Sequence, residues 1–288
     1  MPFIELAIPP YGASEDSLIL NIVASSSFGQ NLPVLVFIHG GGFQIGAARD
    51  YGYEKLAEEI ASNNIIVVTI QYRLGPLGRD SYPSASLPGN AGLWDQVEAL
   101  SFLQKVLPSF GEDASRVTIS GESAGSCSTS ALQYSPHAKG LFKQSIKMSG
   151  SILSEFALSD AVVEASRKLA AELGCAKATS TESIDCMQTV PAEKILEAVE
   201  ATGSTRYHPN FIAYQPRIDG DFFPDTIDVL IKQSPRKHSV MGVAEFEAAL
   251  LTITGKAFVS GLTIEKEDWS SFTREKLVHF ITDVVATE

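Results

Sequence analysis

A serine between two glycines is the first feature of this sequence that could do chemistry. Gly121-Glu122-Ser123-Ala124-Gly125 follows the β-branched residues of 116–121 and precedes a run of small residues. A sharp strand-to-helix turn tolerates only small residues two positions before and after the serine, and it projects the hydroxyl away from the backbone. A helix beginning behind the serine also favours negative charge there. Ser123 is therefore a candidate nucleophile, and we call residues 121–125 the nucleophile elbow.

A second glycine run could supply what a serine nucleophile needs, which is a set of donors for a developing oxyanion. His39-Gly40-Gly41-Gly42-Phe43, the glycine loop, follows the apolar run that starts at Pro33. Consecutive glycines leave backbone N–H groups free to point at a ligand oxygen. Either pattern alone could arise by chance or mark a flexible turn. Together they predict an oxyanion hole formed by the N–H groups of Gly41, Gly42 and Ala124.

The elements that must position these residues alternate between strands and helices. Strand patterns occupy residues 17–25, 33–43, 64–78, 116–121, 142–150 and the start of 237–254, and helical patterns occupy 91–111, the residues after Ser123, 159–175, 191–201 and 263–285. This alternation predicts a mostly parallel sheet with helices on both faces. Ligand sites in such sheets lie beyond the carboxyl ends of the strands, where both glycine motifs fall.

Length and composition exclude several classes of protein. The 288 residues, 44% of them hydrophobic, are enough for one large α/β domain. The net charge of −12 argues against nucleic-acid binding. No run of about 18 apolar residues predicts a membrane span, and the first residues do not resemble a signal peptide, which favours a cytoplasmic location. Three cysteines without a CxxC spacing give no indication of a metal site.

Several stretches resemble the type-B carboxylesterase family, which also contains cholinesterases and cholinesterase-like adhesion proteins. They occur in the family's order as SEDSLILNI (14–22), PVLVFIHGGGF (33–43), YRLGPLG (72–78), LPGNAGLWDQVEAL (87–100), RVTISGESAGS (116–126), GLFKQSIKMSGS (140–151) and PRIDGDFFPD (216–225). The resemblance implies an α/β-hydrolase fold and serine-dependent hydrolysis of small-molecule carboxylic esters, without a cofactor. It also implies that residues 1–288 form a single, partial domain, with the family's N-terminal segment and C-terminal strands missing.

The resemblance also suggests an acid and a disulfide. The family's glutamate follows a late strand in a G-x-x-x-x-E arrangement, which Gly242 and Glu247 match. Glu245 competes for this role, and both carboxylates could instead simply begin a helix. Cys175 and Cys186 match a short disulfide loop of the family and would pair in an oxidising compartment. Cys127, directly behind the elbow, is expected to be a small buried hydrophobe.

The catalytic base is the member of the site that the sequence does not supply clearly. In this fold the histidine follows the acid along the chain. His279 is the only histidine after Glu247, and it lies on the amphipathic helix predicted for 263–285, without a strand and glycine loop to present it. Of the other four, His39 lies in the glycine loop and His137 on a surface connection. His208 lies in a loop before the acid, and His238 lies at the end of a strand that is distant from the site. The chain is expected to be a weak esterase, an esterase fragment, or a catalytically silent binding or adhesion module, of unassigned oligomeric state.

Overall fold

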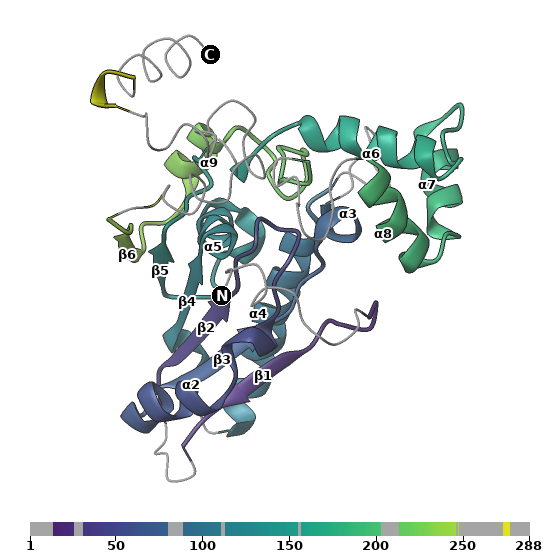
Figure 1. Cartoon of the computed structure of the whole chain (residues 1–288). Helices are drawn as coiled ribbons and strands as arrows, with labels where there is room; N and C mark the ends of the chain where they lie inside the picture. Colours follow the sequence, from purple (N-terminus) through teal and green to yellow (C-terminus); the bar gives the residue numbers. More distant parts are fainter. Residues whose placement is uncertain are drawn as a thin grey trace.

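One six-stranded sheet organises the molecule (Figure 1). The computed structural model describes residues 14–25, 31–79, 89–110, 113–154, 157–202, 213–245, 247 and 273–276. The strands, in spatial order, are β1 (Leu20–Val23), β3 (Ile66–Ile70), β2 (Val34–Ile38), β4 (Val117–Glu122), β5 (Gln144–Met148) and β6 (His238–Gly242). Only the β1–β3 pair in this sheet is antiparallel. The predicted α/β-hydrolase fold is confirmed.

Helices connect most of the strands. They are α2 (Glu54–Glu59), α3 (Gly75–Arg79), α4 (Ala91–Val106), α5 (Ala124–Tyr134), α6 (Ala161–Glu172), α7 (Ser180–Gln188), α8 (Ala192–Ala201) and α9 (Ile227–Gln233). The strand expected across 64–78 ends at Ile70, and α3 then begins at Gly75. Proline is compatible with a first helical turn, so Pro76 does not prevent α3. Of the helix predicted for 263–285, the structure describes 273–276, of which 274–276 are helical.

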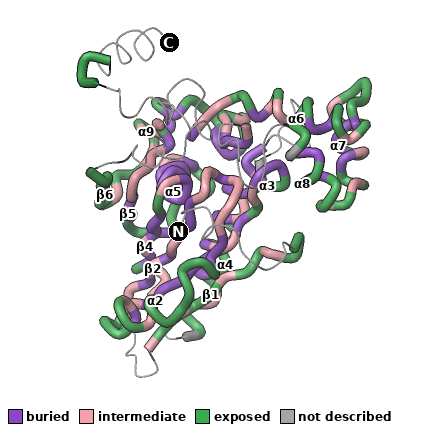
Figure 2. Tube along the Cα trace, in the orientation of Figure 1, coloured by how far each residue is buried: buried purple, intermediate pink, exposed green. Residues whose placement is uncertain are grey.

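The main core lies on one face of the sheet. In β2, Val34, Val36 and Ile38 are buried, whereas the alternate residues Leu35 and Phe37 are only half-buried. The buried side chains belong to a cluster with Leu93, Leu100 and Leu103 of α4 and with Ile119 of β4. Figure 2 shows the same contrast between the buried centre and the exposed periphery. Each fully buried aliphatic side chain contributes about 1.5–3 kcal/mol, so this cluster holds β2 and β4 in place.

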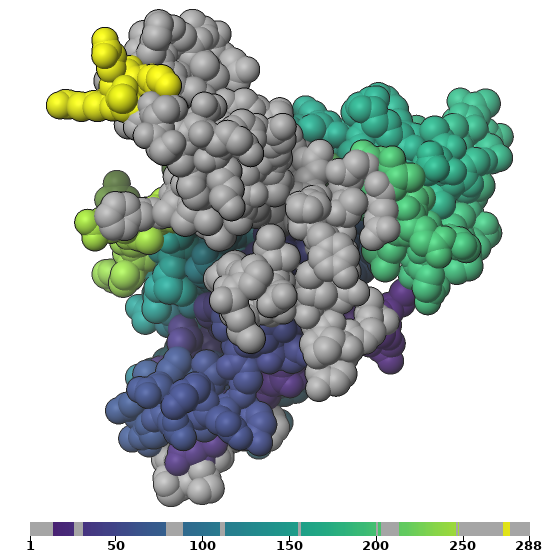
Figure 3. All heavy atoms as spheres, viewed as in Figure 1, coloured from purple at the N-terminus to yellow at the C-terminus, as the bar shows by residue number. Residues whose placement is uncertain are grey.

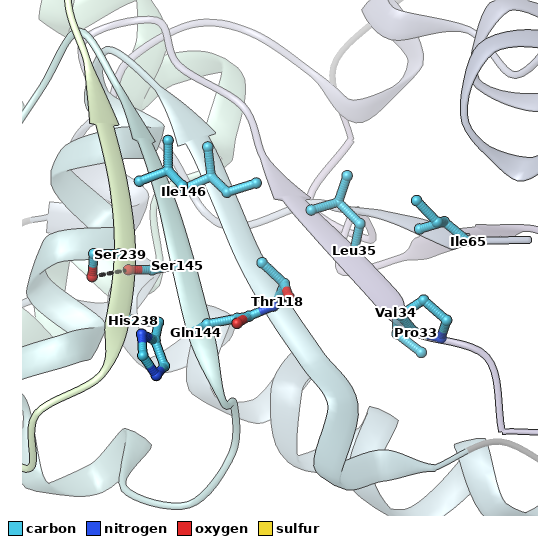
Figure 4. A pocket seen from close by; sticks show the side chains of 11 residues that line it. Pro33, Val34, Leu35, Ile65, Thr118, Gln144, Ser145, Ile146, His238 and Ser239 are labelled. Carbon is cyan, nitrogen blue, oxygen red and sulfur yellow. Dashed lines mark hydrogen bonds between the residues drawn. The ribbon is translucent and has the colours of Figure 1, made fainter. Parts of the chain in front are cut away.

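The strand starts border a cavity of about 460 Å³ (Figure 4). Leu35, Thr118, Ile146 and His238 are among its lining residues. Gln144 and His238 pair at the starts of β5 and β6, whereas Met148 and Gly242 pair at the opposite ends. Because Ser123 follows the carboxyl end of β4, this cavity lies away from the nucleophile elbow.

A second hydrophobic cluster joins α6, α7 and α8, which form a lobe at one side of the molecule (Figure 3). Val162 and Leu169 of α6 pack there with Ile184 of α7 and Ile195 of α8. Cys175, also in this cluster, forms a disulfide with Cys186, with the two Cα atoms 5.5 Å apart.

The disulfide loop that the resemblance implied is helical over the residues of α7. The helix begins because Thr179 and Glu182 form a capping box. The Glu182 N–H donates to Thr179 Oγ1 at 3.2 Å, and the Thr179 N–H donates to Glu182 Oε2 at 3.1 Å. This reciprocal pair satisfies two backbone donors that a helix start leaves unpaired.

Candidate active site

Ser123 lies in a strained backbone conformation between β4 and α5. Its φ of 54° and ψ of −123° belong to a region that residues other than glycine rarely adopt. Two hydrogen bonds hold it there: the Ser123 N–H donates to Met148 O at 2.9 Å, and the Cys127 N–H donates to Ser123 O at 2.9 Å. The strand-to-helix turn therefore presents the Ser123 side chain at the carboxyl end of the sheet.

The two glycines of the elbow are required by close backbone contacts. A Cβ on Gly121 would lie 2.3 Å from the Gly125 carbonyl carbon. A Cβ on Gly125 would lie 2.0 Å from the Ile38 carbonyl oxygen at the end of β2. Both distances are far shorter than van der Waals contact, so neither position can carry a larger residue unless the backbone moves. The spacing seen in the sequence thus has a direct steric cause.

The glycine loop lies against the elbow. A Cβ on Gly40 would stand 3.1 Å from Ser123 Cβ, so the two segments approach closely. Gly41 and Gly42 have φ values of 106° and 60°, which favour glycine. Within the described ranges, no hydrogen-bond partner is found for the backbone N–H groups of Gly41, Gly42 and Ala124. Free, preorganised N–H groups beside a serine can stabilise an oxyanion.

Glu247 is held near the carboxyl ends of β5 and β6. The Ala244 N–H donates to Glu247 Oε1 at 2.7 Å. Two hydrogen bonds lower the pKa of the Glu247 carboxyl: the one from the Ser149 hydroxyl has the larger effect, and the one from this N–H the smaller. Ser149 is itself tied to β6, because its N–H donates to Gly242 O at 2.9 Å. Glu245 is exposed, and no hydrogen bond or ion pair of its side chain is found among the described residues.

Two further polar residues at this site were not singled out in the sequence. Glu122 precedes the nucleophile, and a Cβ on Gly40 would lie 2.9 Å from Glu122 Oε2. Burial, and then the charge of Glu247, raise the pKa of the Glu122 carboxyl. Ser149 is the second, since its hydroxyl contacts Glu247. The sequence signal for Glu122 was its place inside the elbow motif, whereas Ser149 had no such signal.

The described histidines do not pair with the nucleophile or the acid. His238 lies at the start of β6, at the opposite end from Gly242, as expected. His137 is exposed, with Nε2 3.0 Å from Asp221 O. His39 is buried, with Nδ1 2.8 Å from Gly40 O. His208 and His279 lie outside the described residues, so the structure does not describe the one histidine that follows Glu247.

The described ranges contain neither a metal-binding cluster nor a helix that could span a membrane. They hold no group of three histidine, cysteine, aspartate or glutamate residues that could bind a metal ion. None of their helices is both long enough and apolar enough to cross a membrane.

Comparisons with known proteins agree on one family. A model of the carboxylesterase family matches residues 3–286. Gut esterase 1 of Caenorhabditis elegans is 36% identical over 95% of this chain and 47% of its own length. Bile salt-activated lipase of Bos taurus is 38% identical over 75% of this chain and 38% of its own length. Human neuroligin-2 is 36% identical over 70% of this chain and 23% of its own length. The chain spans less than half the length of these relatives.

Proposed function

This chain belongs to the carboxylesterase family, and on that premise we propose that it hydrolyses small carboxylic esters through a covalent intermediate on Ser123. The observation that carries the proposal is the juxtaposition of the strained serine with the glycine loop. The N–H groups of Gly41, Gly42 and Ala124 are without partners in the described part of the chain, and Gly40 lies against Ser123. Two of the curated relatives are named as an esterase and a lipase.

The proposed reaction proceeds in two steps. Ser123 Oγ attacks the ester carbonyl carbon and gives up its proton to a base, while the three N–H groups stabilise the negative carbonyl oxygen. The alcohol leaves with a proton, and an acyl-serine remains. Water then attacks the acyl-serine, which releases the carboxylic acid and restores the hydroxyl. The reaction needs no cofactor.

The base and its orienting acid complete the proposal. Glu247 is the proposed acid, because the Ser149 hydroxyl and the Ala244 N–H hold its carboxylate near the carboxyl ends of β5 and β6, where it can orient an imidazolium. The base is a histidine that the described residues do not contain beside Ser123. In a serine protease, removing the base costs about 10⁶ in turnover, and a smaller activity remains from the oxyanion hole and binding.

A catalytically silent binding module is the second candidate. Two observations favour it: neuroligin-2 is among the relatives, and no described histidine is hydrogen-bonded to Ser123 or Glu247. This candidate predicts affinity for an ester or a partner without turnover.

Hydrolysis of p-nitrophenyl acetate by the purified chain tests both candidates. The wild type is compared with Ser123→Ala and His279→Ala. We expect turnover that disappears in Ser123→Ala, because the alanine cannot form the acyl-serine. Loss in His279→Ala as well would identify His279 as the base or as a residue that positions it. Wild-type turnover equal to that of Ser123→Ala would refute the esterase and leave the binding module.

A further inference from the structure

His39, the first residue of the glycine loop, is packed tightly into the fold. Only 1% of the residue is exposed. Its ring stacks on Tyr72, with ring centroids 4.5 Å apart, and the Tyr72 hydroxyl donates to His39 O at 2.7 Å. A Cβ on Gly46 would lie 2.7 Å from His39 Nδ1, so the chain after the glycine loop closes tightly around the imidazole. The ring therefore has one well-defined position.

The contact that His39 makes fixes its protonation state. Nδ1 lies 2.8 Å from the carbonyl oxygen of Gly40. A carbonyl oxygen only accepts hydrogen bonds, so Nδ1 must carry the proton. Burial lowers the pKa of His39 to about 4, and the imidazole is neutral at neutral pH. Nε2 is then an unprotonated acceptor, and no partner for this buried atom is found among the described residues.

The same contact sets the direction of the next N–H group. The described chain contains no cis peptide bond, so the Gly40–Gly41 peptide is trans. In a trans peptide the C=O and the N–H point in opposite directions. When His39 holds Gly40 O, the Gly41 N–H points away from the imidazole. That N–H belongs to the proposed oxyanion hole and is without a partner in the described residues.

Gly40 is held through its other backbone group as well. Burial, and then the charge of Glu122, raise the pKa of the Tyr51 hydroxyl, and a hydrogen bond with the Gly40 backbone opposes this rise. A bond with this effect is donated to the phenol oxygen, so the Gly40 N–H is the donor. Aromatic side chains thus engage both the carbonyl oxygen and the N–H of Gly40.

We propose that His39 is a positioning residue of the oxyanion hole, which holds the Gly40 carbonyl so that the Gly41 N–H faces the developing oxyanion. The inference rests on the proposed function. Packing alone does not account for His39, because a buried Nε2 without a partner destabilises the fold, and an apolar ring would avoid this cost. The Nδ1–H donor is what an apolar ring would not supply.

Replacing His39 by each of two amides tests this role. Asn places its amide nitrogen near the position of Nδ1, whereas Gln places the same group one methylene farther out. We expect His39→Asn to keep kcat within about 5-fold and His39→Gln to lose about 10²-fold, because one oxyanion donor is worth roughly 10²–10³ in kcat. KM should stay within about 2-fold in both, since ground-state binding is untouched. Equal kcat values for Asn and Gln, or a change confined to KM, would overturn the role.

A second measurement does not depend on the variants folding. Nitrogen-15 spectra of the imidazoles in the wild type should show His39 as the neutral Nδ1–H tautomer throughout neutral pH. An Nε2–H tautomer would overturn the inference even if every variant misfolded. Wild-type activity equal to that of Ser123→Ala would instead refute the proposed function, whereas an active wild type with an unimpaired His39→Gln would refute the positioning role and leave the proposed function standing.

Discussion

The two side chains proposed for catalysis are held to different degrees. Ser123 is fixed by backbone hydrogen bonds to β5 and α5. Glu247 is exposed and depends on the Ser149 hydroxyl and the Ala244 N–H. Because both donors stabilise the ionised carboxylate, they favour the charge that an orienting acid requires.

Glu247→Gln and Glu245→Gln form a matched pair at this scale. We expect Glu247→Gln to lower kcat for p-nitrophenyl acetate by about 10²-fold or more, because the neutral amide cannot stabilise an imidazolium. Glu245→Gln should stay within about 2-fold, since that side chain is exposed and makes no hydrogen bond or ion pair among the described residues. Equal losses in both variants would show that Glu247 has no special role.

Local sterics explain why some site residues were visible in the sequence. The elbow glycines and the glycine loop meet requirements that act within a few residues, so their spacing could be recognised. The contact of Ser149 with Glu247 depends instead on the pairing of β5 with β6, strands separated by about ninety residues of chain. No local pattern records such a contact.

At the scale of an element, the helix α7 also combines a local pattern, which the sequence shows, with a contact to another segment, which the local sequence does not show. The family resemblance implied a short disulfide loop between Cys175 and Cys186, which the structure contains, and within it Thr179 and Glu182 form a capping box that begins a helix. The spacing of these two residues was readable, because S/T-x-x-E marks a helix start. The disulfide then joins the end of the α6 segment to α7 across a separation of 11 residues.

Removing this disulfide should destabilise the lobe of α6, α7 and α8. In the chain-entropy model a loop of this size contributes about 3 kcal/mol. We expect the double variant Cys175→Ser/Cys186→Ser to lower the melting temperature, and dithiothreitol to lower it for the wild type only. The free cysteine Cys127 should not contribute to the effect of dithiothreitol, because burial raises the pKa of its thiol to about 12 and keeps it unreactive. A wild type that is insensitive to reductant would contradict the prediction.

At the scale of the whole molecule, a buried lysine links three elements. Lys147 of β5 is 3% exposed, and its Nζ lies 2.5 Å from Gln133 Oε1 of α5 and 3.3 Å from Ser239 Oγ of β6. Ser239 also shares a hydrogen bond of 2.8 Å with Ser145, drawn in Figure 4. Lys147 makes no ion pair with the described residues. Burial lowers the pKa of its ammonium from 10.5 to about 8.

This lysine should make the free energy of unfolding depend on pH. Between about 8 and 10.5 the unfolded state binds more protons than the folded state, so stability rises with pH there. Below this window the full cost of burying the charge is present. We expect Lys147→Met to be more stable than the wild type at pH 7, by the order of 1–3 kcal/mol, with the difference shrinking toward pH 10.

Urea unfolding at both pH values measures this difference, with the exposed Lys139→Met as the control. Gln133 Oε1 retains a donor in the Met variant, because one of the Ser145 and Ser239 hydroxyls donates to the other and the second remains able to donate to Gln133. A difference that stayed constant with pH would show that burial of the ammonium is not its cause.

The position of β6 in the sheet has a further consequence. All five of its residues are exposed, and in the described structure it pairs with β5 alone, whereas β4 lies between β2 and β5. Ser123 therefore follows an inner strand of the described sheet, whereas Glu247 follows an edge strand, where local opening breaks fewer contacts. Opening of β6 would move Glu247 away from Ser123, and turnover would scale with the closed fraction. A strand that bound along the side of β6 that has no partner strand among the described residues would then act as an activator without touching the substrate.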